Sequence, residues 1–296
     1  MERSSVPPNP YRRAEAPMVS QADKGRAFRA LHHGAKAFLI PNPWDRGSAV
    51  LLQRLGFSAL ATTSAGFAFS LGRRDTEITR DEVLEHVAAI VAVTRLPVSV
   101  DFEDGYAEAP ASVAENYRLV AAAGAVGASI EDATGREDDP IRDRAAAVDR
   151  VRAAVEAVRA LPFQFTLAAR AENYLHGRND LRDTIARLQA YQEAGADVLY
   201  APGLADPEEI ATLVREVDRP VNVLMPTPGL RLSLAELSAL GVKRVSVGSA
   251  LSRVAYGAFL RAATTMREAG TFEFSEDAIS FADITALFDA SGVSKA

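Results

Sequence analysis

The sequence predicts an α/β protein of the (β/α)₈ TIM-barrel class, and three observations support this prediction. The chain has 296 residues, close to the roughly 250 that a single barrel of this class needs. Eight short apolar segments with the character of buried strands follow one another along it. A joint in which a helix-like segment ends in glycine, directly before an apolar segment, recurs at Gly56, Gly124, Gly195 and Gly241.

Each recurring joint has a simple conformational cause. Glycine just past a helix supplies the left-handed residue that closes the helix C-terminus. An apolar segment follows at once in "RLGFSALATT", "AAGAVGASIED", "EAGADVLYAP" and "ALGVKRVSVG". Such helix-to-strand joints at fairly regular intervals indicate alternating β and α units, and therefore a parallel sheet.

The predicted strands are nearly continuous apolar runs, as expected for strands buried on both faces. They lie near residues 38–40, 59–62, 98–100, 128–130, 166–169, 198–200, 221–224 and 245–247, with helical segments between them such as 81–94 and 142–159. Eight such units in this length fit a closed barrel better than an open sheet.

The two ends of the chain differ from its middle. Residues 1–20 are rich in Pro, Ser and Arg, which predicts a disordered or loosely packed arm before a single barrel domain at 21–296. Two further helical segments, 253–268 and 277–288, follow the eighth strand. The second carries an apolar stripe that needs a partner on its own barrel or on a neighbouring subunit, formed by Ile279, Phe281, Ile284, Leu287 and Phe288.

The composition excludes several classes of protein. Net charge is −6 with acids and bases interspersed, so we expect no nucleic-acid partner. No apolar run approaches the roughly 18 residues that span a bilayer, and the N-terminus lacks the apolar core of a signal peptide. The absence of cysteine excludes disulfides and thiolate chemistry and fits a reducing compartment. We therefore expect a cytoplasmic protein that acts on a small molecule.

Polar residues gather where the predicted strands end, which is where barrels of this class carry their chemistry. The second strand ends in Thr62-Thr63-Ser64-Ala65-Gly66. The third, fourth, fifth and eighth strands are followed by Asp101, Glu103 and Asp104, by Glu131 and Asp132, by Arg170, Glu172 and Asn173, and by Gly248 and Ser249. Carboxylates from two adjacent strands should therefore converge on one mouth, with an arginine across from them.

A cluster of oxygen ligands without His or Cys is typical of a site for a hard cation such as Mg²⁺. Alternatives remain open from the residues themselves. Glu131 and Asp132 could cap a helix, and Asp104 could only solvate its loop. Arg170 could pair structurally with Glu172 or bind a substrate carboxylate.

Three further features carry weaker signals. Residues 248–249 could bind a phosphate or cap the next helix. Trp44, after the first strand, could line the pocket or only pack. The four histidines, His32, His33, His86 and His176, do not form a ligand set, and we give them no catalytic role.

The motifs at these strand ends occur in a specific order. They are "NPWDRGSA", "TTSAGFAFSLGRRD", "VDFEDGY", "SIED", "ARAENYL" and "VSVGSAL". In this order the sequence resembles the isocitrate lyase/phosphoenolpyruvate mutase superfamily, from about residue 28 to residue 288. The resemblance implies a (β/α)₈ barrel whose eighth helix is displaced and often swapped between subunits, and hence a homo-oligomer, either a dimer or a tetramer.

The resemblance also implies roles for individual residues. Asp101 would contact Mg²⁺ directly, with Mn²⁺ as an alternative cofactor, and Glu103 and Glu131 would hold the waters of the metal. The substrate carboxylate would be bound by backbone N–H groups, with Trp44 beside the pocket. The residues expected to meet the substrate are Ser64, Ala65, Gly66, Asp75 near the reacting group, and Arg170 at the α-oxyacid end.

The sequence departs from the superfamily in the half of the site that supplies acid and base. The segment after the fourth strand, "IEDATGREDDPIRD", has neither the catalytic cysteine of the isocitrate and methylisocitrate lyases nor the gating lysine and asparagine of the phosphonopyruvate-forming mutases. The histidine that some members place after strand six is replaced by "YAPG". By position alone, Tyr106, Glu172 and Asp75 are the candidates for acid and base.

The predicted function is an Mg²⁺-dependent carbon–carbon lyase or decarboxylase that acts on a small 2-oxo or 2-hydroxy carboxylic acid through a metal-stabilised enolate. Two alternatives remain. One is a mutase or hydrolase that handles the P–C bond of a phosphonate on the same scaffold. The other is a non-catalytic barrel that binds an oxyacid.

Overall fold

Eight parallel strands form a nearly closed barrel in the computed structural model, which describes residues 19–289. The strands are β1 (Phe38–Ile40), β2 (Leu60–Ala61), β3 (Val98–Val100), β4 (Gly127–Glu131), β5 (Thr166–Arg170), β6 (Val198–Tyr200), β7 (Val221–Leu224) and β8 (Arg244–Ser246). They pair in the order β1-β8-β7-β6-β5-β4-β3-β2. A backbone hydrogen bond of 3.1 Å from Ala61 to the carbonyl of Pro41 links the two edge strands. The predicted (β/α)₈ fold is confirmed.

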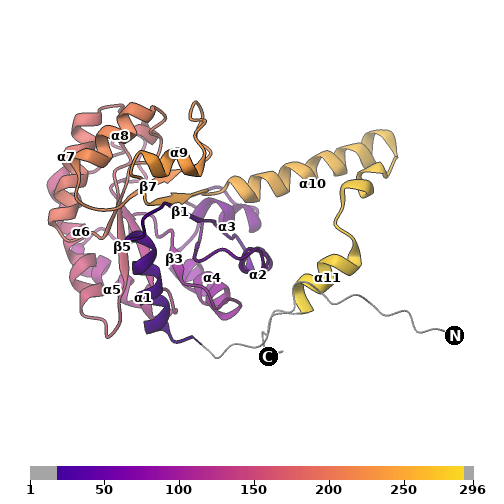
Figure 1. The fold of residues 1–296 in the computed structure, drawn as a ribbon, viewed down its shortest axis with the longest axis horizontal. Helices are drawn as coiled ribbons and strands as arrows, with labels where there is room; N and C mark the ends of the chain where they lie inside the picture. The colour runs from indigo at the N-terminus through magenta and orange to yellow at the C-terminus, as the bar shows by residue number, and fades with distance from the viewer. Residues whose placement is uncertain (1–18, 290–296) are drawn as a thin grey trace.

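Helices cover the outside of this barrel (Figure 1). They are α2 (Arg46–Arg54), α3 (Ser64–Ser70), α4 (Arg80–Ala92), α5 (Pro110–Ala122), α6 (Arg144–Arg159), α7 (Leu181–Glu193), α8 (Pro207–Glu216) and α9 (Leu234–Ala239), with a short 3₁₀ helix, η1 (Asn173–His176), after β5. The four joint glycines have φ angles of +86°, +97°, +105° and +92°, so they are left-handed, as predicted.

Four of the eight strands have the predicted bounds, and β2, β4 and β5 differ from the predicted 59–62, 128–130 and 166–169 by one residue at one or both ends. The segments predicted at 38–40, 98–100, 198–200 and 221–224 coincide with β1, β3, β6 and β7. The eighth strand was predicted at 245–247, but β8 begins at Arg244. The pattern excluded Arg244 because a charged residue does not fit an apolar run, whereas the structure places it inside the strand and buries it.

Helix α1 (Gln21–His32) closes the barrel at the amino ends of its strands. Ser20 caps it by accepting a hydrogen bond from the Asp23 N–H. The side chain of Lys24 donates to the carbonyl of Thr94, just before β3, at 2.9 Å. Phe28 is fully buried and packs with apolar residues of β1 and β2 and with Val126. Most of the arm predicted at 1–20 lies outside the described residues.

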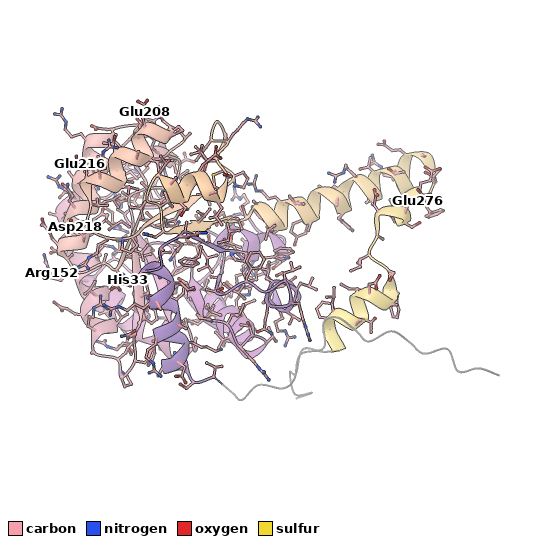
Figure 2. All side chains as sticks on the ribbon, in the orientation of Figure 1. His33, Arg152, Glu208, Glu216, Asp218 and Glu276 are labelled. Carbon is pink, nitrogen blue, oxygen red and sulfur yellow. The ribbon has the colours of Figure 1, made fainter. Side chains whose placement is uncertain are left out.

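The C-terminal segment projects from the barrel and returns toward it (Figure 1). It consists of α10 (Ala250–Ala269), η2 (Glu273–Asp277) and α11 (Phe281–Asp289). Figure 2 shows Glu276 at its outer end, away from the barrel. Helix α11 contacts α2, but Phe281 remains 86% exposed. The apolar stripe predicted here is therefore covered only in part by its own barrel.

The long helix α10 is almost entirely uncovered, since Ser252 is its one buried residue. It exposes several large apolar side chains: Leu251, Val254, Phe259, Leu260 and Met266. No helix within residues 19–289 is both long enough and apolar enough to cross a membrane.

Gly25 allows α1 to approach the barrel, and we predict that Gly25→Ala destabilises the fold. A Cβ there would lie 2.2 Å from the backbone carbonyl oxygen of Gln164, which cannot move without shifting the chain before β5. Such overpacking costs about 1–3 kcal/mol or more, which exceeds the roughly 1 kcal/mol that alanine gains over glycine in a helix. Gly34→Ala is the control, because its nearest contact would be 3.4 Å away. Thermal unfolding should show a lower Tm for Gly25→Ala alone.

His32 makes the stability of the barrel depend on pH. Its ring is buried edge-on between Phe28 and Phe38, and burial, together with the positive charge of Arg244, lowers the pKa of His32 to about 3. Between pH 3 and about 6.5 the unfolded chain therefore binds a proton that the folded chain does not. The free energy of unfolding must fall as the pH drops through this window, by about 1.4 kcal/mol per pH unit for this group.

We predict that His32→Leu removes this contribution. Urea unfolding at several pH values from 4 to 7 should show a shallower dependence in the variant than in wild type. Equal slopes in the two proteins would contradict the burial of a neutral His32.

Candidate active site

A cavity of about 250 Å³ opens at the carboxyl ends of the strands and is lined by residues from, or just after, all eight of them. Five of the predicted site residues line it: Ser64, Ala65, Asp75, Asp101 and Arg170. A second hollow, of about 380 Å³, lies at the amino ends beside α1. Because chemistry in this fold takes place at the carboxyl ends, the first cavity is the candidate active site.

Asp101 directly follows β3 and is held from three sides. One carboxylate oxygen, Oδ2, accepts hydrogen bonds from the backbone N–H and the hydroxyl of Ser64, both at 3.1 Å. The other, Oδ1, accepts from Nη1 of Arg170 at 2.7 Å. Its own N–H donates to the hydroxyl of Thr62 at 3.0 Å. The carboxylate is therefore fixed where the ends of β2, β3 and β5 meet.

Arg170, the last residue of β5, contacts carboxylates that lie at the ends of three strands. Its guanidinium lies 2.7 Å from Asp101, 3.1 Å from Glu131 and 2.8 Å from Glu172, and it stands over the ring of Tyr200 at 5.1 Å. Burial opposes its charge, but these carboxylates hold the pKa of Arg170 well above its usual value. The predicted pair with Glu172 exists, and substrate binding by Arg170 remains a prediction.

The surroundings of Glu103 and Glu131 disfavour the ionised form of their carboxyl groups. Burial is the main reason that the pKa of Glu103 rises to about 7, with repulsion from Asp101 and Asp75 adding to it. A hydrogen bond of 2.8 Å from the Tyr106 hydroxyl partly offsets these effects. Burial likewise raises the pKa of Glu131 well above its usual value, against the attraction of Arg170.

The turn after β3 is strained. Glu103 and Tyr106 have φ angles of +43° and +53°, which non-glycine residues rarely adopt. Such strain persists only where the surrounding structure imposes it, and it gathers at functional sites. Asp104 provides that constraint, since its Oδ2 lies 2.9 Å from Arg142 and 3.3 Å from Arg150.

Asp104 is therefore a structural anchor between this turn and α6, in place of the loop solvation that its sequence position suggested. Both arginines are buried, so the ion pairs are shielded from water on the helix side.

Asp132 belongs to a buried network, and neither it nor Glu131 caps a helix, because α6 begins only at Arg144. Asp132 Oδ1 accepts from the N–H of Glu172 at 2.8 Å. Its Oδ2 accepts from Arg187 at 3.1 Å and from the hydroxyl of Tyr191 at 2.6 Å. The helix-capping alternative is thus wrong, and the network instead holds Glu172 beneath Arg170.

The predicted carboxylate-binding segment starts α3. Thr63 caps this helix by accepting from the N–H of Gly66 at 3.2 Å, and the N–H of Ser64 donates to Asp101. Ala65 lines the cavity, whereas Gly66 is buried with the Cβ of Trp44 close behind it. Gly66 and Trp44 are not among the residues that line the cavity. Substrate binding by this segment remains a prediction.

Asp75 lies on the exposed rim of the cavity. Partial desolvation and repulsion by Asp101 raise the pKa of Asp75. Tyr106 and Glu172, the other two acid/base candidates, are tied into the Glu103 and Arg170 contacts and do not line the cavity. Asp75 is thus the candidate that a substrate can reach.

Asn42 and Arg244 are among the lining residues that the sequence reasoning missed. Asn42 follows β1, accepts from the N–H groups of Val247 and Gly248 at 2.9 and 3.0 Å, and donates to the carbonyl of Thr62 at 2.8 Å. It thereby joins the ends of β1, β2 and β8. Arg244 reaches the cavity from β8. Its signal was a basic residue inside a strand pattern, "KRVSVG", which was treated as the strand's border.

The residues present fit Mg²⁺. No three acidic or histidine side chains within residues 19–289 form a complete protein ligand set. Mg²⁺ does not need one, because it typically takes one or two protein carboxylates and keeps several waters. Asp101 lines the cavity, and the raised pKa values of Glu103 and Glu131 mark a buried excess of carboxylates that a divalent cation would relieve.

Comparisons with known proteins identify the family of the chain. The protein-family model of phosphoenolpyruvate phosphomutase matches residues 28–267. An uncharacterized protein of Mycobacterium tuberculosis is 37% identical over 238 residues, which cover 80% of this chain and 86% of that protein. The 2-methylisocitrate lyase of Salmonella typhimurium is 31% identical over 270 residues, covering 86% and 88% of the two chains.

A crystal structure of a Burkholderia cenocepacia J2315 protein described as a lyase/mutase is similar throughout, with a TM-score of 0.89 and 63% identity over 90% of this chain and 96% of that one. The match extends across the strands that carry Asp101, Glu131 and Arg170. The chain therefore belongs to the phosphoenolpyruvate phosphomutase family within the isocitrate lyase/phosphoenolpyruvate mutase superfamily, and it is an enzyme of the lyase type.

Proposed function

We propose that this protein is an Mg²⁺-dependent carbon–carbon lyase or decarboxylase that acts on a small 2-oxo or 2-hydroxy carboxylic acid through an enolate. The observation that carries the proposal is Asp101, fixed between Ser64 and Arg170 at the wall of the cavity. An oxygen-donor site of this kind, next to an arginine, suits a metal-chelated oxyacid.

Several relatives support this choice of chemistry. Besides the 2-methylisocitrate lyase, the oxaloacetate decarboxylase of Chromohalobacter salexigens is 31% identical over 78% of this chain. A phosphonopyruvate hydrolase solved with oxalate and Mg²⁺ has a TM-score of 0.80 and 23% identity, a likeness that shows the fold alone. The chain lacks the lysine and asparagine of the phosphonopyruvate-forming mutases, so we place P–C bond chemistry second.

Different residues of the site would have different roles in such a reaction. Bound Mg²⁺ would polarise the oxo and carboxylate oxygens of the substrate and stabilise negative charge that develops on them. Asp101 would hold the metal, with Glu103 and Glu131 around its waters. Arg170 would hold Asp101 and Glu131 close together, because its guanidinium lies within 3.1 Å of both.

Asp75 is the group that we assign to proton transfer. Cleavage of a 2-hydroxy acid requires a base for the hydroxyl proton, and the enolate carbon must later receive a proton. Asp75 lies on the rim of the cavity, and its raised pKa brings it toward the range where a carboxyl can do both. Its place beside Asp101 puts it near the oxygens that carry the charge.

The test of this proposal is a screen of 2-oxo and 2-hydroxy di- and tricarboxylates for release of pyruvate or glyoxylate, with and without Mg²⁺. Release that depends on Mg²⁺ supports the proposal. Phosphonopyruvate turnover with no C–C cleavage in the panel would favour the second candidate.

We also propose that the chain forms a homo-oligomer through α10 and α11. These helices expose an apolar surface that includes Val254, Phe259, Leu260 and Phe281. Monomeric proteins rarely leave large contiguous apolar surfaces in water. A second copy of the chain, with its own uncovered α10, offers a surface of the same chemistry.

We predict that Asp101→Asn removes Mg²⁺ binding and Mg²⁺-dependent activity while leaving Tm close to that of wild type, because Arg170 keeps two other carboxylate partners, Glu131 and Glu172. Asp104→Asn is the matched control three residues away. It should keep Mg²⁺ binding but lower Tm, because the buried Arg150 loses its carboxylate partner and the buried Arg142 keeps only Glu108. Isothermal titration with MgCl₂ and thermal unfolding measure both. Unchanged Mg²⁺ affinity in Asp101→Asn would refute the metal assignment.

The oligomer proposal predicts that replacing Val254, Phe259 and Leu260 together by Ser lowers the mass of the assembly. Analytical ultracentrifugation should show smaller species for the variant than for wild type, and circular dichroism should show that the barrel remains folded. An unchanged sedimentation coefficient in a folded variant would rule out α10 as the contact.

A further inference from the structure

We propose that Arg244 binds a second carboxylate of the substrate, so that the preferred substrate is a dicarboxylate held at both ends of the cavity. This inference rests on the proposed function, because it takes the first carboxylate to lie at the Mg²⁺ site. It adds a specificity-determining residue on β8, across the barrel from β3.

Arg244 is placed for this role by the barrel itself. It is the first residue of β8 and lies in register with Phe38 of β1 and Asn222 of β7. Its residue exposure is only 5%, and together with Ser246 it lines the same cavity as Asp101 and Arg170. The cavity therefore has a cationic group from β5 and another from β8.

The two arginines differ in what neutralises them. Arg170 lies within 3.1 Å of three carboxylates. Arg244 forms no ion pair within 4.0 Å among residues 19–289. Its Nε donates to Asn222 Oδ1 at 2.9 Å, and its Nη1 is buried without an acceptor in the described part of the chain.

A buried guanidinium without a carboxylate in contact is costly, since the more distant Tyr200 and Asp101 only partly compensate its desolvation. Burial lowers the pKa of Arg244 to about 10, and the nearby Arg170 adds to the effect, so the group is still charged at neutral pH. Such a cation is stabilised when an anion enters the cavity beside it. A planar guanidinium suits a carboxylate, with which it forms short, charge-assisted hydrogen bonds.

Asn222 fixes the orientation of the Arg244 guanidinium. Its amide oxygen accepts from Arg244 Nε, and its amide nitrogen donates to the hydroxyl of Ser246 at 3.0 Å. Both partners lie on β8, so the amide is locked and the Nε edge of the arginine is occupied. Nη1 is left for a ligand.

The test compares two inhibitors that share the pair of adjacent oxygen-bearing carbons expected to chelate Mg²⁺. Oxalate consists of this chelating group alone, whereas 3,3-difluorooxaloacetate adds a distal carboxylate. Isothermal titration in the presence of Mg²⁺ should give Arg244→Met an affinity for 3,3-difluorooxaloacetate about 10- to 100-fold below that of wild type, the loss expected for one charged hydrogen-bonded contact. Its affinity for oxalate should stay within about threefold. Arg244→Lys, which keeps the charge, should lose less than Arg244→Met.

The other outcomes each overturn the proposal. Equal losses for both inhibitors, or a fall in the Tm of ligand-free Arg244→Met together with loss of oxalate binding, would show that Arg244 only supports the fold. A loss confined to phosphonopyruvate would assign Arg244 to a phosphonate instead of a carboxylate. If wild type binds oxalate only weakly and without need of Mg²⁺, the proposed function itself fails, and the dicarboxylate inference fails with it.

Discussion

The ion pairs of Arg170 hold this site together, because they allow three carboxylates to share one barrel mouth. Without a cation among them, Asp101, Glu131 and Glu172 would repel one another in a place that water barely reaches. The barrel register makes the arrangement possible, since Glu131, Arg170 and Tyr200 stand side by side on β4, β5 and β6. The geometry of the predicted metal ligands depends on this one guanidinium.

A second layer of charges fixes the groups around Arg170. Asp132, joined to Arg187 and Tyr191, holds the backbone of Glu172. Asp104, joined to Arg142 and Arg150, holds the strained turn that carries Glu103. Each acid of this layer is paired with an arginine from α6, from α7 or from the segment before α6. The helices that bury the barrel therefore also set the positions of the carboxylates at its mouth.

The charges of the cavity also suggest how one family can act on different acids. The β2 to β5 side carries the features shared with the superfamily motifs, and there the positive charge of Arg170 is already neutralised by the protein. The β8 side carries Arg244, which the described protein leaves without a counter-ion. If Arg244 binds substrate as we propose, substrate choice could change on β8 while the proposed metal-binding side is kept. The C-terminal helices form a further region, whose exposed apolar surface we propose for assembly.

The sequence by itself determined the barrel, because its signals are local: apolar runs of strand length, glycines that must be left-handed, and acids placed just after strands. It also identified Asp101, Asp75, Ser64, Ala65 and Arg170, all of which line the cavity. Only the tertiary structure decided the roles of Asp104 and Asp132, because their partners Arg150 and Arg187 lie 46 and 55 residues away. It also decided that Arg244 points into the site. A charged residue within a strand breaks the apolar pattern, and only closure of β8 onto β1 and β7 shows that it is buried where a ligand can meet it.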